Sequence, residues 1–180
     1  MVLADQTESG ELDPENWTVK MRNGVASGGR LRNPPAMPSE FSLTRRVEFA
    51  ETDMAGIMHF ANFFQWMESC ETAFYRTLGL PLISFVPGQI VGWPRVHVSC
   101  TYRVPLRFND EVVVKLFVKK LGPRSVTYVF QFWTAGRLAA QGEVTAVCVK
   151  AGEKGGMVSQ AIPPEFRAKL AEAPESAWGG

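Results

Sequence analysis

The chain has 180 residues, of which 46% are hydrophobic and 21% are charged, and its net charge is +1. That is enough chain for one globular domain with a substantial core. Because there is no basic excess, the composition argues against nucleic acid as a partner. The three cysteines and two histidines are scattered along the chain. They predict neither a disulfide framework nor a metal site built by the protein.

The first 40 residues are rich in Gly, Pro, Asn and Ser and show little apolar periodicity. We interpret residues 1–40 as a flexible N-terminal extension, with an arm that packs on a neighbouring subunit as the alternative. No basic stretch followed by an apolar run is present, so no secretory signal is expected, and no apolar stretch approaches the ~20 residues of a membrane span. The default expectation is a soluble cytoplasmic protein.

The ordered domain is expected over residues 41–152, starting with a strand at FSLTRRVEFA. A long helix is predicted from about Asn62 to Leu78, where Gly79 and Pro81 end it. Its apolar residues recur at steps of three or four, at Phe63, Met67, Cys70, Phe74 and Leu78. Further apolar residues lie off this stripe, so the helix is expected to be buried on more than one side.

Four segments after Pro87 are rich in β-branched and aromatic residues, at residues 90–104, 110–122, 124–136 and 137–152. Short turn sequences separate them, so consecutive strands are predicted to pair antiparallel. Residues 153–180 are predicted to form a C-terminal segment with a short helix at PPEFRAKLAEA and a polar tail. This order predicts an α+β fold in which one antiparallel sheet wraps around one long central helix.

The loop between the first strand and the helix contains Asp53, Gly56 and His59. A carboxylate near a helix start is commonly a turn or capping group. Asp53, however, lies about eight residues before the helix body, and the intervening MAGIMHFA is mostly apolar. Gly56 permits a positive φ or close backbone approach. Free N–H groups at the helix start could hold an oxyanion while a carboxylate acts as base or nucleophile, which suits hydrolysis of an activated acyl group.

The segment VEFAETDMAGIMHFANFFQWMESCETAFYRTLGLP resembles the signature of the hotdog-fold acyl-CoA thioesterases, in particular the 4-hydroxybenzoyl-CoA thioesterase-like family. RVHVSCTYRVPLRFNDEVVVKL is similar to the second strand and following turn of that family, so the resemblance covers roughly residues 41–150. It implies the hotdog fold and hydrolysis of a small acyl-CoA to a free acid and CoA, without a metal or redox cofactor. It also implies a homodimer or homotetramer whose acyl pockets form between subunits.

The resemblance also implies roles for particular residues. Asp53 matches the catalytic aspartate, as nucleophile or general base, and the backbone N–H of Phe60 matches the group that polarises the thioester carbonyl, with Gly56 shaping the loop. Glu68 matches a helix position that faces the acyl pocket. Since a helix glutamate is the base in another branch of the fold, Glu68 and Glu71 are competing catalytic candidates.

The chain departs from the family pattern at three positions of this loop. Glu51 stands where a second Asp is common, His59 stands where Tyr or Trp is frequent, and Phe60 replaces a usual Tyr or His. These departures leave the acyl group of the substrate open. His59 either hydrogen-bonds Asp53 or the carbonyl, or is a partly buried residue that orders the turn, which we favour. His97 is expected to be a structural or surface residue.

The CoA moiety is expected to contact cations for its phosphates. A turn that holds the nucleotide in the resembling family matches KKLGPRS, which contains Lys119, Lys120, Arg124 and Ser125. The alternative is a solvated hairpin turn. Trp66 and Trp93 could line the acyl pocket and favour an aryl group, or could belong to the core.

Two other functions stay open from the sequence. One is a hotdog enoyl-CoA hydratase or dehydratase that uses Asp53 and His59. The other is a non-catalytic module that binds acyl-CoA.

Overall fold

The structure is a computed structural model that describes residues 38–81, 84–86, 89–152 and 156–179. The predicted N-terminal extension therefore lies outside the described residues except for its last three. In chain order the elements are β1 (Glu40–Arg46), η1 (Phe49–Glu51), α1 (Phe60–Thr77), β2 (Ser84–Val86), β3 (Gln89–Val91), β4 (Arg95–Tyr102), β5 (Glu111–Leu121), β6 (Ser125–Thr134), β7 (Arg137–Val147), β8 (Val149–Ala151), β9 (Met157–Ser159), α2 (Pro164–Arg167) and η2 (Glu175–Ala177).

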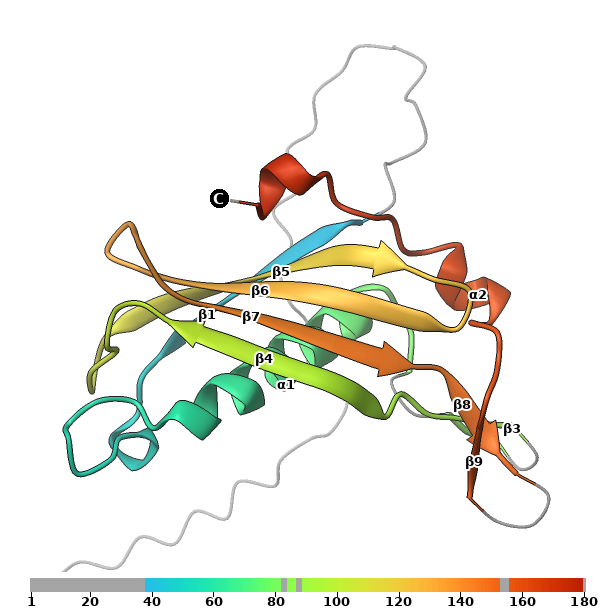
Figure 1. Cartoon of the computed structure of the whole chain (residues 1–180), viewed down its shortest axis with the longest axis horizontal. Helices are drawn as coiled ribbons and strands as arrows, with labels where there is room; N and C mark the ends of the chain where they lie inside the picture. The colour runs from blue at the N-terminus through green and yellow to red at the C-terminus, as the bar shows by residue number, and fades with distance from the viewer. Residues whose placement is uncertain (1–37, 82–83, 87–88, 153–155, 180) are drawn as a thin grey trace, which may run out of the picture. The chain divides into compact units, whose positions relative to one another are not determined.

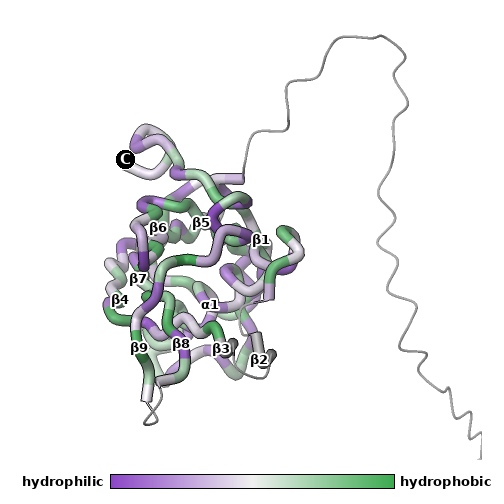
Figure 2. The backbone as a smooth tube through the Cα atoms, turned by 90° about the vertical axis from the view of Figure 1, so that its right-hand side faces the viewer, coloured by the Kyte–Doolittle hydropathy of each residue, from purple (hydrophilic) through white to green (hydrophobic). Residues whose placement is uncertain are grey.

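Five strands form one antiparallel sheet in the order β1-β5-β6-β7-β4, and α1 lies along one face of it (Figure 1). Turned by 90°, the chain shows α1 inside the curve of the sheet (Figure 2). The predicted α+β architecture with a wrapped central helix is confirmed. The pairs β5–β6 and β6–β7, predicted from their short turns, are also confirmed.

The predicted pairing of β4 with β5 is wrong, because β4 pairs with β7 and β5 pairs with β1. The connection after β4 contains Pro105, which has no N–H to donate. It crosses the loop before α1, where the Met58 N–H donates to the Leu106 carbonyl at 2.7 Å. The chain thus passes from one edge of the sheet to a place beside β1. Among the described residues, β4 is left with one edge unpaired.

The helix α1 begins two residues earlier than predicted and ends one residue earlier. Its buried side chains are Phe63, Trp66, Met67, Cys70, Glu71, Phe74 and Tyr75. This set includes four of the five stripe residues and three residues off the stripe, so the expectation of burial on more than one side is confirmed. Gly79 has a φ of +63°, which glycine adopts readily as it ends a helix.

The helix packs closely on β7 at Gly142. A Cβ atom at that position would lie 2.0 Å from Cε of Met67 and 2.9 Å from the carbonyl oxygen of Ser99. Only a residue without a side chain fits between the helix and the strand. Nearby, the ring centroids of Phe63 and Phe132 lie 5.1 Å apart. These contacts determine the packing distance between α1 and the sheet.

The C-terminal segment docks on the domain and forms less helix than predicted. The helix α2 has four residues, but Phe166 within it and Leu170 beyond it are both buried. The Ala173 N–H then donates to the Val118 carbonyl at 2.8 Å, and Gln131 Nε2 donates to the Trp178 carbonyl at 3.1 Å. The segment therefore starts at the C-terminal end of α1, where the Phe166 and Tyr75 ring centroids lie 6.0 Å apart, and ends beside β6 near Gln131 (Figure 1).

Candidate active site

The loop between β1 and α1 folds into a tight turn around Asp53. The Asp53 N–H donates to the Ile57 carbonyl, and the Gly56 N–H donates to the Asp53 carbonyl, both at 2.9 Å. The Asp53 carboxylate accepts a hydrogen bond from the Ala55 N–H at 2.8 Å. Gly56 has a φ of +70°, so the expectation of a positive φ there is confirmed. Asp53 does not cap α1, as its spacing predicted.

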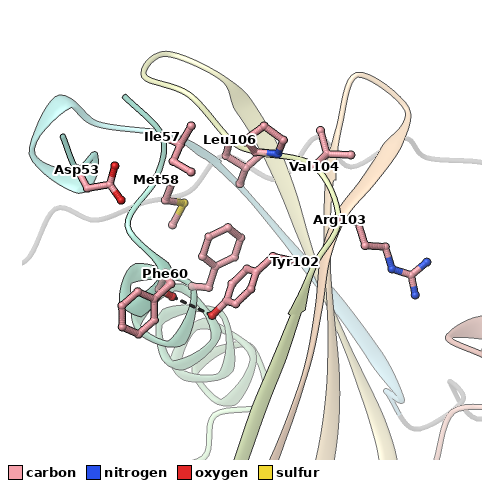
Figure 3. A pocket seen from close by; sticks show the side chains of 10 residues that line it. Asp53, Ile57, Met58, Phe60, Tyr102, Arg103, Val104 and Leu106 are labelled. Atoms are coloured by element: carbon pink, nitrogen blue, oxygen red, sulfur yellow. Dashed lines mark hydrogen bonds between the residues drawn. The ribbon is translucent and has the colours of Figure 1, made fainter. Parts of the chain in front are cut away.

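The exposed Asp53 borders a cavity of about 370 Å³ between this loop and the end of β4 (Figure 3). We call it the loop cavity. Its lining residues are Asp53, Ile57, Met58, Phe60, Phe63, Tyr102, Arg103, Val104, Pro105 and Leu106. Most of these side chains are apolar, so the Asp53 carboxylate lies at the edge of an apolar surface.

The first turn of α1 borders the same cavity. Phe60 is the first residue of the helix, and N–H groups of a first helical turn have no acceptor within the helix. The helix dipole favours negative charge at this end. Figure 3 shows the Tyr102 hydroxyl pointing at the Phe60 carbonyl, to which it donates at 3.2 Å. The loop cavity therefore joins a carboxylate to a helix N-terminus, an arrangement that can activate a nucleophile and stabilise an oxyanion.

His59 orders the start of the helix. It is the N-cap of α1, where its Nδ1 accepts from the Ala61 N–H at 3.4 Å and its ring lies 4.5 Å from that of Phe60. The described contacts include no hydrogen bond between His59 and Asp53. This agrees with the turn-ordering interpretation, although the side chain is exposed and not partly buried. His97 is exposed on β4, as expected.

A second cavity of about 430 Å³ lies between the middle of α1 and the other end of β4. We call it the helix cavity. Its lining residues are Phe64, Gln65, Met67, Glu68, Glu71, Trp93, Pro94, Arg95, Val98 and Val144. The structure thus brings together three predicted site residues, Glu68, Glu71 and Trp93, but it places them in a different cavity from Asp53.

Glu71 is the buried carboxyl of the helix cavity, with 2% of its surface exposed. Burial raises its pKa to about 7, and the guanidinium of Arg95, which donates to the carboxylate, limits that rise. Arg95 is held in turn by the Trp93 carbonyl at 2.6 Å. Glu68 lies on the same side of the helix but is exposed. The helix cavity therefore has an apolar wall and an ion pair whose carboxylate is buried.

Trp66 lines neither cavity, and its assignment as a substrate contact is corrected accordingly. It is fully buried, and its indole N–H donates to the carboxylate of Glu51 at 2.6 Å. Trp93 is 5% exposed and packs on Phe166 with a ring separation of 5.5 Å. Trp93 is thus a core residue that also borders the helix cavity.

The predicted phosphate-binding cluster lies at the far end of the sheet from Asp53. It consists of Lys119, Lys120, Arg124 and Ser125 around the β5–β6 turn. The start of β5, at Glu111, pairs with Arg46 at the end of β1 and so lies beside the Asp53 loop. Because β5 rises ~3.4 Å per residue, its end lies roughly 30 Å away. Within one chain the cluster and Asp53 are not brought together.

Two residues of this cluster have partners in the chain. Lys119 donates to Glu143 at 2.5 Å, and its ammonium lies 5.1 Å from the centre of the Trp178 ring. Arg124 donates to the Ser159 hydroxyl at 3.4 Å. Lys120 is exposed. Lys120 and Arg124 are therefore more available to a phosphate than Lys119.

The sequence pattern gives no functional role to Glu51, Arg95 or Tyr102. Glu51 appeared only as a departure from a pattern. Arg95 and Tyr102 lie at the two ends of β4, whose place at the sheet edge could not be predicted once β4 was paired with β5. In the part of the chain that the structure describes, no three His, Cys, Asp or Glu side chains converge as metal ligands, and no helix is both long and apolar enough to cross a membrane.

Comparisons with known proteins identify the family of the chain. The sequence model of the thioesterase-like superfamily matches residues 47–175. The chain is 30% identical over 117 residues to a 1,4-dihydroxy-2-naphthoyl-CoA hydrolase of Synechococcus sp. (strain CC9605), covering 62% of this chain and 78% of that protein.

Two solved structures extend the comparison. A gentisyl-coenzyme A thioesterase, BH1999, is similar with a TM-score of 0.61 and 29% identity, covering 71% of this chain and 99% of that one. A 4-hydroxybenzoyl-CoA thioesterase variant complexed with 4-hydroxybenzoyl-CoA has a TM-score of 0.65 and 16% identity, covering 74% of this chain and 100% of that one. At that identity the second likeness shows the hotdog fold alone.

Proposed function

Because the chain belongs to the thioesterase-like superfamily, we propose that it hydrolyses the thioester of an acyl-CoA to a free acid and CoA. The observation that carries this proposal is the loop cavity, where the exposed carboxylate of Asp53 and the first turn of α1 border the same space. The names of the naphthoyl-CoA and gentisyl-CoA relatives support a thioester of CoA as the substrate.

In the proposed reaction, Asp53 acts on the thioester by one of two routes. As a nucleophile, its carboxylate oxygen attacks the carbonyl carbon, the C–S bond breaks, CoA leaves as a thiolate, and water then hydrolyses the mixed anhydride. As a general base, it takes a proton from water while the resulting hydroxide attacks the same carbon, after which the C–S bond breaks and CoA leaves and takes up that proton as the thiol. On either route the Phe60 N–H and the α1 dipole stabilise the negative charge on the carbonyl oxygen.

We further propose that two copies of the chain complete the site. On the free edge strand β4, Val96 is 63% exposed and Val98 is 50% exposed, which suits pairing with a second chain. The loop cavity lies near Tyr102, and the helix cavity lies near Arg95, at opposite ends of this strand. Antiparallel pairing of β4 with its copy would therefore set the loop cavity of one chain beside the helix cavity of the other.

In this arrangement the remaining predicted site residues would lie close to the substrate. Glu68 and Glu71 of the partner chain would face the acyl group, and the β5–β6 turn of the partner chain would approach the end that holds Asp53. Lys120 and Arg124 could then bind the phosphates of CoA. Aromatic residues line both cavities, Phe60 and Phe63 in one and Phe64 and Trp93 in the other, and they favour an aromatic acyl group.

The test is thiol release from a panel of aryl, short-chain and long-chain acyl-CoAs, measured for the wild type and for Asp53→Asn. We expect turnover in the wild type and a kcat lower by ~10²–10⁴-fold in Asp53→Asn, the range of a general base, with an unchanged melting temperature. Glu111→Gln, at an exposed carboxylate paired with Arg46, is the matched control and should keep full turnover.

Three outcomes would contradict the proposal. Normal turnover in Asp53→Asn would move the chemistry to Glu68 or Glu71. Hydration of crotonyl-CoA without thiol release would make the chain a hydratase. Tight binding of acyl-CoAs with no thiol release from any of them would make it a binding module.

A further inference from the structure

Glu51 is the centre of a hydrogen-bond network that joins β1, η1 and α1 to the Asp53 turn. We call this network the Glu51 hub, and its members are Arg45, Glu48, Glu51, His59, Asn62 and Trp66. It includes one residue from the strand before the loop, two from the helix after it and the cap between loop and helix. The sequence pattern gives Glu51 no role in the reaction.

The carboxylate of Glu51 accepts three hydrogen bonds. One oxygen accepts from Trp66 Nε1 at 2.6 Å and from Arg45 Nη2 at 3.1 Å, and the other accepts from the Glu48 N–H at 2.9 Å. The side chain is 17% exposed. The Arg45 guanidinium also lies 4.5 Å from the centre of the Trp66 ring, a cation–π contact. Because all three partners are donors, an acceptor-only carboxylate satisfies them and an amide cannot satisfy all of them.

The backbone carbonyl of Glu51 binds the other side of the loop. It accepts from the His59 N–H at 2.8 Å and from Asn62 Nδ2 at 2.7 Å. Glu51 stands two residues before Asp53, and His59 stands one residue before Phe60. Glu51 therefore connects the two ends of the loop, because it stands at the end of η1 and is bonded to the start of α1.

Asp53 itself makes only local bonds within the turn. Its carboxylate accepts from Ala55, two residues away, and its side chain is exposed. The Glu51 hub therefore contributes to the distance between the Asp53 carboxylate and the Phe60 N–H, together with the bridge between Thr52 and Met58. Catalysis by a paired base and oxyanion donor is sensitive to such a distance, since a shift of ~1 Å can cost ~10²-fold in rate.

We infer that Glu51 is a positioning residue, which holds the Asp53 turn against the first turn of α1 so that both reach the same thioester. This inference rests on the proposed function. Since Glu51 does not line the loop cavity, its loss should change the rate of the chemical step and leave substrate binding largely unchanged.

The test compares kinetics and binding in hub variants. We expect Glu51→Gln to lower kcat by ~10–100-fold with KM changed less than about twofold. Glu51→Asp, which keeps the charge on a shorter side chain, should recover part of this loss. The dissociation constant of a non-hydrolysable thioether analogue of the substrate should stay within about twofold of the wild-type value.

Adjacent arginines of β1 provide a matched control. Arg45 donates to Glu51, whereas Arg46 donates to Asn109 and Glu111, outside the hub. Arg45→Ala should lower kcat several-fold, and Arg46→Ala should not. Equal effects of the two substitutions, or a loss of analogue binding in Glu51→Gln as large as its loss of kcat, would overturn the inference.

A spectroscopic measurement separates this inference from the proposed function. The ¹⁵N-bound indole proton of Trp66, assigned with Trp66→Phe, should shift in Glu51→Gln and stay in place in Asp53→Asn. Normal turnover in Asp53→Asn refutes the catalytic role of Asp53. An inactive Asp53→Asn together with a fully active Glu51→Gln refutes only the positioning role of Glu51.

Discussion

Asp53 and Glu71 are carboxyl groups in two cavities along the same α1–β4 interface, and their surroundings differ in almost every respect. Asp53 is exposed and held by backbone bonds within its own turn. Glu71 is 2% exposed, is paired with Arg95 and has a pKa raised to about 7 by burial. The difference indicates a division of roles: Asp53 is open to a reacting group, whereas Glu71 is tied to the structure of its cavity.

The largest expected difference between the two groups is catalytic. The ~10²–10⁴-fold loss of kcat proposed for Asp53→Asn should not be matched by Glu71→Gln, which should stay within about tenfold of the wild type. The Glu71 carboxylate already binds Arg95, so it is poorly placed to take a proton from water at the loop cavity. Steady-state thiol release measures both variants, and a reversed ranking would assign the chemistry to Glu71.

Stability should show the opposite order. Glu71→Ala removes a buried side chain and its hydrogen bond to Arg95, whose side chain is 29% exposed, so the free energy of unfolding should fall by about 2 kcal/mol. Asp53→Ala removes one hydrogen bond on the surface and should cost about 1 kcal/mol. Urea unfolding of the two variants checks this expectation. Equal losses would show that the burial of Glu71 is not what distinguishes the two sites.

The titration of Glu71 should make the free energy of unfolding depend on pH. Its pKa is raised in the folded state from 4.5 to about 7, so the folded chain binds more protons than the unfolded chain between these values. Its contribution to stability is fully present below pH 4.5 and is lost as the pH rises through 7. Relative to Glu71→Gln, the wild type should lose about 3 kcal/mol of unfolding free energy across this window. Parallel curves for the two proteins would contradict the raised pKa.

The smallest expected effect is at Glu68, which shares the helix cavity with Glu71 but is exposed. Glu68→Gln should change KM for an aryl acyl-CoA by only about threefold, because a water-exposed contact contributes little. The comparison with a straight-chain acyl-CoA in the same variant serves as the control. A loss of kcat as large as that of Asp53→Asn would instead show that Glu68 shares the chemistry.

Much of the fold could be predicted because its determinants are local. The spacing of apolar residues from Phe63 to Phe74 indicated the central helix, and the short turns after Leu121 and Thr134 indicated two hairpins. The place of β4 depends on a long-range choice of partner strand, which turn sequences cannot reveal. For this reason the helix cavity and its Glu71–Arg95 pair were not foreseen, since they form only where α1 meets β4.

The candidate site also has a local part that the sequence predicts and a long-range part that it does not. Asp53, Gly56 and the start of α1 lie within a few residues of each other, so their pattern could be recognised. The role of Glu51 depends on Arg45 and Trp66, which come from a strand and from the second turn of a helix. Only the folded chain brings those donors to one carboxylate, so the sequence alone cannot distinguish Trp66 as a partner of Glu51 from Trp66 as a substrate contact.

Gly142 also affects a cavity that it does not line. A methyl group there would lie 2.0 Å from Cε of Met67, so the Met67 side chain would have to move to another rotamer. Because Met67 lines the helix cavity, such a movement would change the shape of that cavity. The shape of the helix cavity thus depends on a residue of β7 that does not line it.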